Sequence, residues 1–510
     1  MEHDESVTYL AATGHMAAFQ QARYGGLAGH WVSAAQWKAL LSPGPFWSFG
    51  RVASGLARYD EHPPLYFWLL HVWTMVFGVT LHTGAVLNVV IAATTCLCLF
   101  GFACYVLASR WQAAAVAVVW ALSPATIATS YMARHYDLFA LVTVCCLWLF
   151  ALCSDTRRRL TWRLLVLLGL ASAAGWLTHY QFALVLIAGC GLAVLRLARH
   201  ERRRLGLLLA AVLVGLLATA AVNPLFLMAV RHQRVQAHAF SARLELQRIE
   251  NATVALTRFF VYDKTSAQGR TSIETLNHWL ATARHLRSAA LAVLCLVALV
   301  AWLSVRLRLG HRLLAWIRSR DPGVAVPVYY LFAVGGLTIG MYLAFQSPVY
   351  ATAPRYLAAV WPFVAFVPVL VGRLFGRWAV IIAFAICLAV ILPNGIHDAR
   401  ASTIPRVPAG EFATANRVFL SNEERGNLLP VIWDLPPRVR VFLLPQASTY
   451  HDPGSWLDAL RPGDVFVSIN GPMRPQLRAH VLEVLGGRFT LMRLKGRVNG
   501  AYRVYRLEPR

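Results

Sequence analysis

Residues 58–68 read Arg58-Tyr59-Asp60-Glu61-His62-Pro63-Pro64-Leu65-Tyr66-Phe67-Trp68, and an apolar run continues from there to Gly78. Proline is well tolerated in the first turn of a helix, because its missing N–H would have no partner there. The Pro-Pro step therefore predicts the start of a membrane helix. The ionisable side chains before it, Asp60, Glu61 and His62, then lie at the membrane–water boundary. A simpler explanation also fits, since an acidic helix start complements the helix dipole.

Composition assigns the chain to the integral membrane proteins. Its 510 residues are 58% hydrophobic and only 14% charged, and the mean hydropathy is +0.53. Apolar residues come in long blocks, which is typical of an all-α polytopic membrane protein and excludes an ordinary soluble enzyme. Acids are scarce, because only Asp137 and Asp155 lie between Glu61 and Glu201. An acid near a membrane boundary is therefore informative in this chain.

The net charge of +25 could suggest a nucleic-acid partner, but the arginines cluster in short loops between apolar blocks. Such clusters occur at residues 157–159, 202–204 and 306–320. This distribution is what the positive-inside rule produces. We therefore assign the charge to membrane topology and to contacts with anionic lipids, and we expect no nucleic-acid partner.

The nine cysteines lie within or at the ends of apolar blocks and form no metal-like spacing with histidine. They are best explained as small buried hydrophobic residues. The sequence therefore predicts no metal site and no cofactor.

About eleven apolar blocks follow the Pro-Pro step. They lie near residues 63–79, 83–107, 112–129, 137–153, 163–177, 182–196, 206–230, 288–304, 325–346, 356–371 and 377–393. If the arginine-rich loops are cytoplasmic, the opposite helix ends and a loop at 231–287 lie outside. The blocks 63–79 and 83–107 should then supply an odd number of crossings, although they are two. Either one of them does not fully cross or one loop is misassigned, and the sequence does not decide between these alternatives.

Three regions are expected. Residues 1–62 read as a first extracytoplasmic loop with helices along the membrane surface, and residues 63–395 as the transmembrane domain. Residues 396–510 are predicted to form a small soluble α/β domain. Its strands are expected at 441–444, 464–469, 489–494 and 501–507, with a helix at 475–485.

Polar clusters converge on the predicted outer face. They are Asp4 and Glu5; Asp60, Glu61 and His62; Arg134, His135 and Tyr136; His179 and Tyr180; and Arg355 and Tyr356. Each has a plain explanation: an N-cap for Asp4, a snorkelling side chain for Arg134, a packing histidine for His179, an interfacial anchor for Arg355. Together, two acids beside several cations are what is needed to deprotonate a nucleophile and to stabilise a departing phosphate.

These residues resemble a known family, the membrane glycosyltransferases of the GT-C superfamily, in the branch of protein O-mannosyltransferases and bacterial aminoarabinose and core-sugar transferases. The resemblance covers most of residues 1–395. It is carried by Asp4-Glu5, by Asp60-Glu61-His62-Pro63-Pro64-Leu65-Tyr66, by Ala133-Arg134-His135-Tyr136, by Thr178-His179-Tyr180, and by Pro354-Arg355-Tyr356-Leu357 ahead of Trp361-Pro362.

The resemblance implies a GT-C-like bundle and a role for each cluster. Asp4 would be the catalytic base and Glu5 its catalytic neighbour. Binding of the donor phosphate and substrate would fall to Asp60, Glu61, His62, Arg134, Tyr136, His179, Tyr180, Arg355 and Tyr356. Two departures stand out. Met132 occupies a position where the family often has Glu, and the transmembrane helix that precedes the acidic pair in the family is missing, so we expect the true start to lie upstream.

We expect a transferase that moves a sugar from a polyprenyl-phosphate donor to a glycan, lipid or protein acceptor, with inversion. The expected location is the bacterial cytoplasmic membrane, with the site on its outer side and membrane lipids as partners. A transporter or flippase for lipid-linked glycans is the alternative, but transporters place ionisable groups near the midplane and often show internal repeats. A polymerase or ligase that uses the loop 231–287 is the third interpretation.

Overall fold

The structure is a computed structural model. It describes residues 3–60, 62–80, 82–225, 259–260, 322–345, 354–403, 415–420, 425–444, 454–469, 475–494 and 502–510. Glu61, the apolar block 288–304 and nearly all of the loop 231–287 lie outside these ranges. Contacts divide the chain into two compact units. The first is Met1–Leu87, Met132–Arg134 and Thr403–Arg510, and the second is Asn88–Tyr131 and His135–Ser402.

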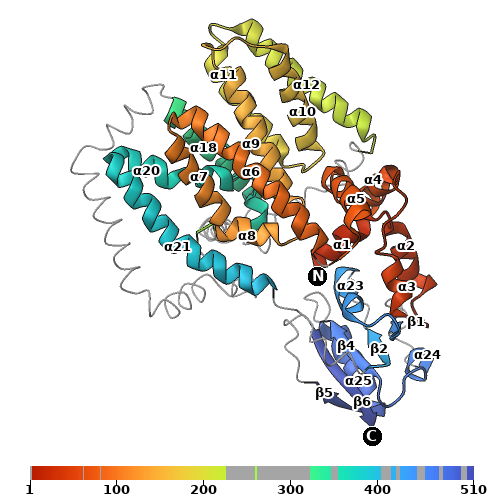
Figure 1. The fold of residues 1–510 in the computed structure, drawn as a ribbon. Coiled ribbons are helices and arrows are strands. Elements are labelled where there is room, and N and C mark those ends of the chain that lie inside the picture. Colours follow the sequence, from red (N-terminus) through yellow and green to blue (C-terminus); the bar gives the residue numbers. More distant parts are fainter. Residues whose placement is uncertain are drawn as a thin grey trace. The chain divides into compact units, whose positions relative to one another are not determined.

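The second unit is helical (Figure 1). Its helices are α6 (Thr83–Leu107, whose first turn belongs to the first unit), α7 (Arg110–Leu122), α8 (Pro124–Ser130), α9 (Tyr136–Cys153), α10 (Trp162–Trp176), α11 (Phe182–Leu197), α12 (Arg202–Val222), α18 (Pro322–Phe345), η5 (Pro354–Leu357), α19 (Trp361–Val364), α20 (Val367–Phe375) and α21 (Arg377–Thr403). Helices α10, α11 and α12 lie side by side (Figure 1).

Five of the described helices are long and apolar enough to cross a membrane: α6, α9, α12, α18 and α21. A sixth crossing forms if α7 and α8, bent by 57° at Ser123, count as one span. Apolar side chains on these helices face outward, because Phe332 and Trp378 are 74% and 75% exposed. Lipid rather than water suits such surfaces. The predicted helical membrane bundle is confirmed in the described residues.

The first unit combines short helices with one mixed sheet. Its N-terminal helices are α1 (His3–Ala12), α2 (Met16–Gln21), α3 (Ala34–Ala39), α4 (Phe49–Tyr59) and α5 (Leu65–Phe77), with a π-helical turn η1 (Ala22–Gly26). Ser33 caps α3, because its side chain accepts from the Gln36 N–H while Gln36 bonds back to the Ser33 N–H. Helix α5 begins directly after Pro63-Pro64, close to the predicted start.

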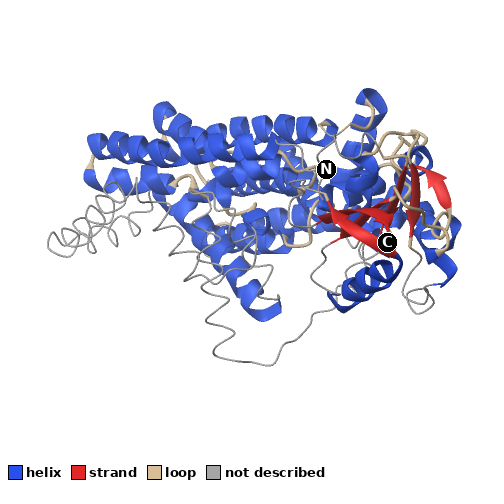
Figure 2. Ribbon diagram, turned by 90° about the horizontal axis from the view of Figure 1, so that it is seen from below, coloured by secondary structure: helices blue, strands red, loops and turns tan. Residues whose placement is uncertain are grey.

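Six strands form the sheet, in the order β1-β3-β2-β4-β6-β5 (Figure 2). They are β1 (Trp31–Ser33), β2 (Arg417–Leu420), β3 (Arg440–Leu443), β4 (Val465–Ile469), β5 (Phe489–Arg493) and β6 (Tyr502–Pro509). Helix α23 (Arg425–Asp434) joins the parallel strands β2 and β3, α24 (Gly454–Leu457) precedes β4, and α25 (Pro475–Arg488) follows it. A small C-terminal α/β region is therefore confirmed.

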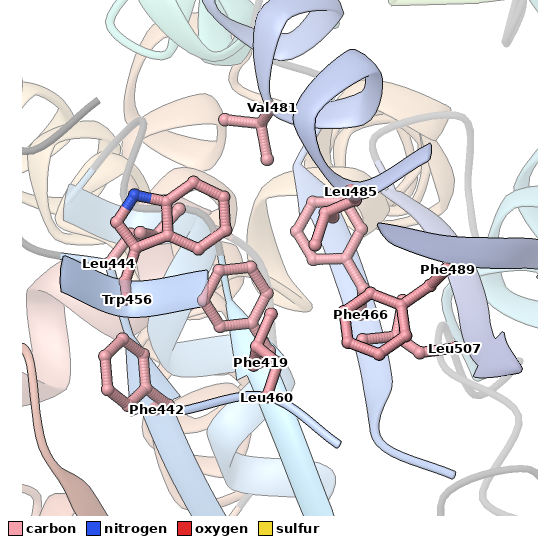
Figure 3. Packing of buried hydrophobic residues seen from close by; sticks show 10 residues of the cluster. All are labelled: Phe419, Phe442, Leu444, Trp456, Leu460, Phe466, Val481, Leu485, Phe489 and Leu507. Atoms are coloured by element: carbon pink, nitrogen blue, oxygen red, sulfur yellow. The ribbon is translucent and has the colours of Figure 1, made fainter. Parts of the chain in front are cut away.

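Buried aromatic and aliphatic side chains between the sheet and α25 form the core of this region (Figure 3). Phe419 of β2 stacks on Trp456 with ring centroids 5.5 Å apart, and it also contacts Phe466 of β4. Val481 and Leu485 of α25 close the cluster from the helix side. Two of these strands were not expected. Strand β2 matches none of the predicted strands, and β1 comes from the predicted surface-helix region and pairs antiparallel with β3.

Candidate active site

The acidic stretch before the Pro-Pro step lies at the junction of α4 and α5. Asp60 follows the last residue of α4, and its N–H bonds to the Leu56 carbonyl at 3.0 Å. His62 Nδ1 lies 2.7 Å from the Asp60 carbonyl oxygen and 3.1 Å from its carboxylate Oδ2. A carbonyl oxygen only accepts hydrogen bonds, so Nδ1 carries the proton.

Arg134 comes to the same carboxylate from a distant part of the sequence. Its guanidinium Nη1 lies 3.7 Å from Asp60 Oδ2. The Arg134 residue is 5% exposed, and the Asp60 side chain is 14% exposed. Charges removed from water to this degree are stable only when they are paired and hydrogen-bonded. Asp60, His62 and Arg134 therefore form one ionic cluster within the first unit.

The Glu5 side chain contacts the backbone of the residue directly before Arg134. Its buried carboxylate Oε1 accepts a hydrogen bond from the Ala133 N–H at 3.1 Å. Helix α1 supplies Glu5, and this helix packs against α5 and α23. The two carboxylates of Glu5 and Asp60 thus approach the same short segment, Met132–Arg134, from the two ends of the N-terminal region.

Tyr9, one turn further along α1, fixes the start of α6. Its hydroxyl oxygen accepts the Gly84 N–H at 2.7 Å. That N–H belongs to the first turn of α6, where backbone donors have no partner inside the helix. Burial raises the pKa of Tyr9, and the Gly84 hydrogen bond and Glu5 act as smaller influences. The hydroxyl therefore stays neutral. A Cβ at Gly84 would overlap Ala133, so glycine permits this close approach.

The remaining first-unit candidates are described only in part. Asp4 lies in the first turn of α1, next to Glu5, and the described part of the structure does not include its side chain. Glu61 lies outside the described residues. Their roles stay predictions.

The second unit holds the other predicted residues, and aromatic contacts bring several of them together. His179 stacks on Phe139 at 4.7 Å with the rings 14° apart, and its ring centroid lies 5.0 Å from that of His135. Tyr136, at the start of α9, contacts Tyr356 of η5 with centroids 6.2 Å apart. Phe139 carries no signal in the sequence that separates it from other apolar helix residues.

Arg355 and Tyr180 complete the predicted set. The Arg355 guanidinium lies 5.3 Å from the ring centroid of the neighbouring Tyr356, within the range of a cation–π contact. Tyr180 lies in the turn between α10 and α11, where its carbonyl accepts the Ala183 N–H at 3.3 Å. The chain passes from the first unit to the second between Arg134 and His135. That Arg355 joins the carboxylates around one cavity stays a prediction.

Asp137 is a buried acid that is not among the predicted site residues. It lies in the first turn of α9, is 2% exposed, and accepts a hydrogen bond from the Thr129 hydroxyl at 2.7 Å. This bond joins the two ends of the segment that contains Arg134 and Tyr136. The signal that the sequence offers is an acid at the start of an apolar run. Within the described residues, no three His, Cys, Asp or Glu side chains are grouped as metal ligands.

Comparison with known proteins supports the predicted resemblance. Residues 61–226 match the family model described as dolichyl-phosphate-mannose-protein mannosyltransferase. The match indicates an enzyme, a glycosyltransferase of the GT-C type. It includes the Pro-Pro step, Arg134, Tyr136 and His179, whereas Glu5 and Arg355 lie outside it. No curated protein sequence matches the chain.

Two solved structures are similar to the chain. One is the crystal structure of ArnT from Cupriavidus metallidurans bound to undecaprenyl phosphate, with a TM-score of 0.47 and 12% identity, covering 98% of this chain and 93% of that chain. The other is ArnT from the same organism in the apo state, with a TM-score of 0.46 and 14% identity, covering 88% of each chain.

Proposed function

We propose that the chain transfers a sugar from a polyprenyl-phosphate donor to an acceptor hydroxyl on the outer side of the cytoplasmic membrane, with inversion. The family match supports a donor of this class, because dolichyl phosphate mannose is itself a polyprenyl-phosphate sugar. The observation that carries the proposal is the cluster of Asp60, His62 and Arg134 beside Glu5 in one unit. It joins carboxylates to cations at the junction of α4 and α5.

Asp4 is proposed as the base. Its carboxylate takes the proton of the acceptor hydroxyl as the acceptor oxygen attacks the anomeric carbon. The bond between that carbon and the phosphate oxygen breaks, and the phosphate leaves with the bonding electrons. Attack from the face opposite the phosphate inverts the anomeric centre. Glu5, next in α1 and bonded to the Ala133 N–H, is proposed to hold this helix turn against the segment that carries Arg134.

Arg134 is proposed to stabilise the charge that grows on the departing phosphate. A guanidinium offers five N–H donors in a planar fork, a geometry that matches phosphate oxygens. Asp60 is proposed to fix Arg134 and His62 in position through its contacts of 3.7 Å and 3.1 Å. Arg355 is proposed as a second cation for the same phosphate, with Tyr136, His179, Tyr180 and Tyr356 around the substrate.

The test is transfer of radiolabel from a panel of polyprenyl-phosphate sugars, with the full chain in membranes. Asp4→Asn should abolish transfer, since an amide cannot accept the proton, while the variant keeps its unfolding temperature. Glu201→Gln is the matched control, because Glu201 is exposed and lies at the start of α12. Retained turnover in Asp4→Asn would remove Asp4 from the role of base. Movement of the labelled lipid across the bilayer without transfer would instead favour a flippase.

A further inference from the structure

Three helix junctions of the second unit meet near the C-terminal end of α9. The Arg373 guanidinium at the end of α20 donates to the Leu107 carbonyl at 2.6 Å and to Gln112 at 2.8 Å, which joins the α20–α21 junction to the α6–α7 turn. The Tyr105 hydroxyl donates to Asp155 Oδ2 at 3.1 Å. This bond connects the α9–α10 loop to the end of α6.

Arg204 of α12 joins the same end. Its guanidinium is buried and donates to the carbonyls of Cys153 at 2.7 Å, Arg158 at 3.0 Å and Asp155 at 2.9 Å. Carbonyls at a helix C-terminus have no partner inside the helix, and a cation there also complements the helix dipole. The α9–α10 loop is therefore held in one conformation by the helix that packs beside it.

A pocket of about 520 Å³ opens between these junctions. It is lined by Tyr105, Val106, Leu107, Ala108, Asp155, Arg157, Arg158 and Arg373. The α6–α7 turn that forms one wall is tight, because Ala108 has a φ of 51°, a conformation uncommon for a residue with a Cβ. The pocket is thus built from fixed elements.

Its charge is positive. Among the described residues that line it, Asp155 is the one acid, against the three arginines 157, 158 and 373. Asp155 orients two of them, with Nε of Arg157 at 3.1 Å and Nε of Arg158 at 3.6 Å. Each guanidinium has further N–H donors beyond Nε, and the side chains of Arg157 and Arg158 are 73% and 56% exposed. An anion at the pocket mouth can therefore bind two oriented guanidinium groups.

Exposed tryptophans mark the depth of this end in the membrane. Trp111, Trp162 and Trp378 stand in the first turns of α7, α10 and α21, and they are 42%, 69% and 75% exposed. Tryptophan is enriched at the membrane–water interface. The phosphates of lipid headgroups lie at that depth. The position of the pocket at the membrane surface, in addition to its positive charge, therefore favours a lipid as the ligand.

We propose that this pocket is a binding site for the phosphate of an anionic phospholipid headgroup, with Arg157 and Arg158 as the contacting residues. The density of arginine at this end places it in the cytoplasmic leaflet by the positive-inside rule. The lipid would hold these three helix junctions of the second unit together. Binding here is independent of whether the chain transfers sugars.

The test measures thermal unfolding of the purified full chain in detergent with phosphatidylglycerol, phosphatidylcholine or inorganic phosphate added. A ligand that binds the folded state raises the unfolding temperature by mass action. Phosphatidylglycerol should raise it with saturation, and the other two should not. The double variant Arg157→Gln/Arg158→Gln should need roughly tenfold or more phosphatidylglycerol for half the effect, since each arginine near a lipid surface contributes to binding.

Arg159→Gln/Arg163→Gln is the matched control. It removes the same charge from the same region but changes no residue that lines the pocket, so the phosphatidylglycerol requirement should stay within about twofold of the wild type. If glutamine lowers stability without lipid, Arg157→Lys/Arg158→Lys retains the charge and should retain most of the effect. Equal weakening in both glutamine pairs, or equal stabilisation by inorganic phosphate, would overturn the proposal.

Discussion

Arg134 is a buried cation that pairs with the Asp60 carboxylate. Because of this pairing, we expect substitution by glutamine and substitution by lysine to have different effects on stability and turnover. Arg134→Gln leaves Asp60 without its guanidinium, and breaking a buried pair is strongly destabilising. Arg134→Lys keeps the charge but loses the planar fork that matches a phosphate. We expect the lysine variant to fold and to lose about 10²-fold in turnover, the loss typical of removing one donor to a developing negative charge.

Turnover and unfolding temperature of both Arg134 variants should be measured together. Arg163→Lys is the control, because Arg163 is exposed at the start of α10. Full turnover in Arg134→Lys would show that a point charge suffices, and full turnover in Arg134→Gln would remove Arg134 from the site.

The ionisation of Asp155 makes the stability of the folded chain depend on pH. Burial alone would raise the pKa of Asp155, but hydrogen bonds from Arg157 and Tyr105 outweigh it and hold the pKa below the ordinary value of 3.8. The folded state therefore binds this proton less readily than the unfolded state. The stabilisation is fully present above the ordinary value and is lost as the pH falls through the lowered one.

We accordingly expect the unfolding temperature of the wild type to fall more steeply than that of Asp155→Asn between about pH 5 and about pH 3. Other carboxylates titrate in both proteins, so the difference between the two slopes isolates Asp155. Parallel slopes would contradict the expectation.

At the scale of the helices, the start of α6 depends on a hydroxyl from α1. Tyr9→Phe removes the acceptor of the Gly84 N–H while the ring still fits. Leaving a buried donor without a partner costs about 1–3 kcal/mol, which thermal unfolding in detergent will detect. Tyr24→Phe is the control, since Tyr24 is 49% exposed. An unchanged unfolding temperature in Tyr9→Phe would show that water replaces the hydroxyl.

The sequence predicts the long apolar helices well and the short elements poorly. Helices α6 and α9 lie within a residue of the expected blocks, because their length and apolar composition decide the assignment locally. The break between α7 and α8 was missed although Ser123-Pro124 carries its signal: Ser123 caps α8 by accepting the Thr126 N–H, and Pro124 stands at the first helical position. Strand β1 is three residues long, and its partner β3 is some 400 residues away in the sequence.

At the scale of the whole molecule, the ionic cluster shows what sequence can and cannot predict. The residue types that meet there, Glu5, Asp60, His62 and Arg134, were all singled out from motifs. Their meeting is a property of the fold, since the Ala133 N–H that binds Glu5 is a backbone group without any sequence signal. The sequence assigns no role to Tyr9 or Gly84 for the same reason, because only the packing of α1 on the start of α6 gives them one.

Contacts within the first unit connect the C-terminal region to the N-terminal helices, including α1, which carries the proposed base. Trp31 of β1 donates its indole N–H to the Ala459 carbonyl at 3.1 Å and lies under the Arg417 guanidinium at 3.9 Å. Lys38 of α3 donates to the Leu435 carbonyl at 2.6 Å. Helix α1, which carries Asp4 and Glu5, packs against α23 of the same region. The C-terminal residues are therefore part of the support of the proposed site.

We therefore expect Trp31→Ala to weaken the support of the proposed site indirectly, through the C-terminal region. Truncating a large, partly buried aromatic side chain costs about 2–4 kcal/mol, and it should loosen the pairing of β1 with β3. Cleavage by trypsin after Lys38 should become faster, and sugar transfer should fall, although the contacts described for Trp31 are with Ala459, Arg417, Phe442 and Arg440 and not with a proposed catalytic residue. Trp162→Ala, which removes a 69% exposed side chain from the other unit, should leave the Lys38 site protected. A Trp31→Ala chain with normal transfer and unchanged cleavage would show that the C-terminal region is dispensable to the support of α1.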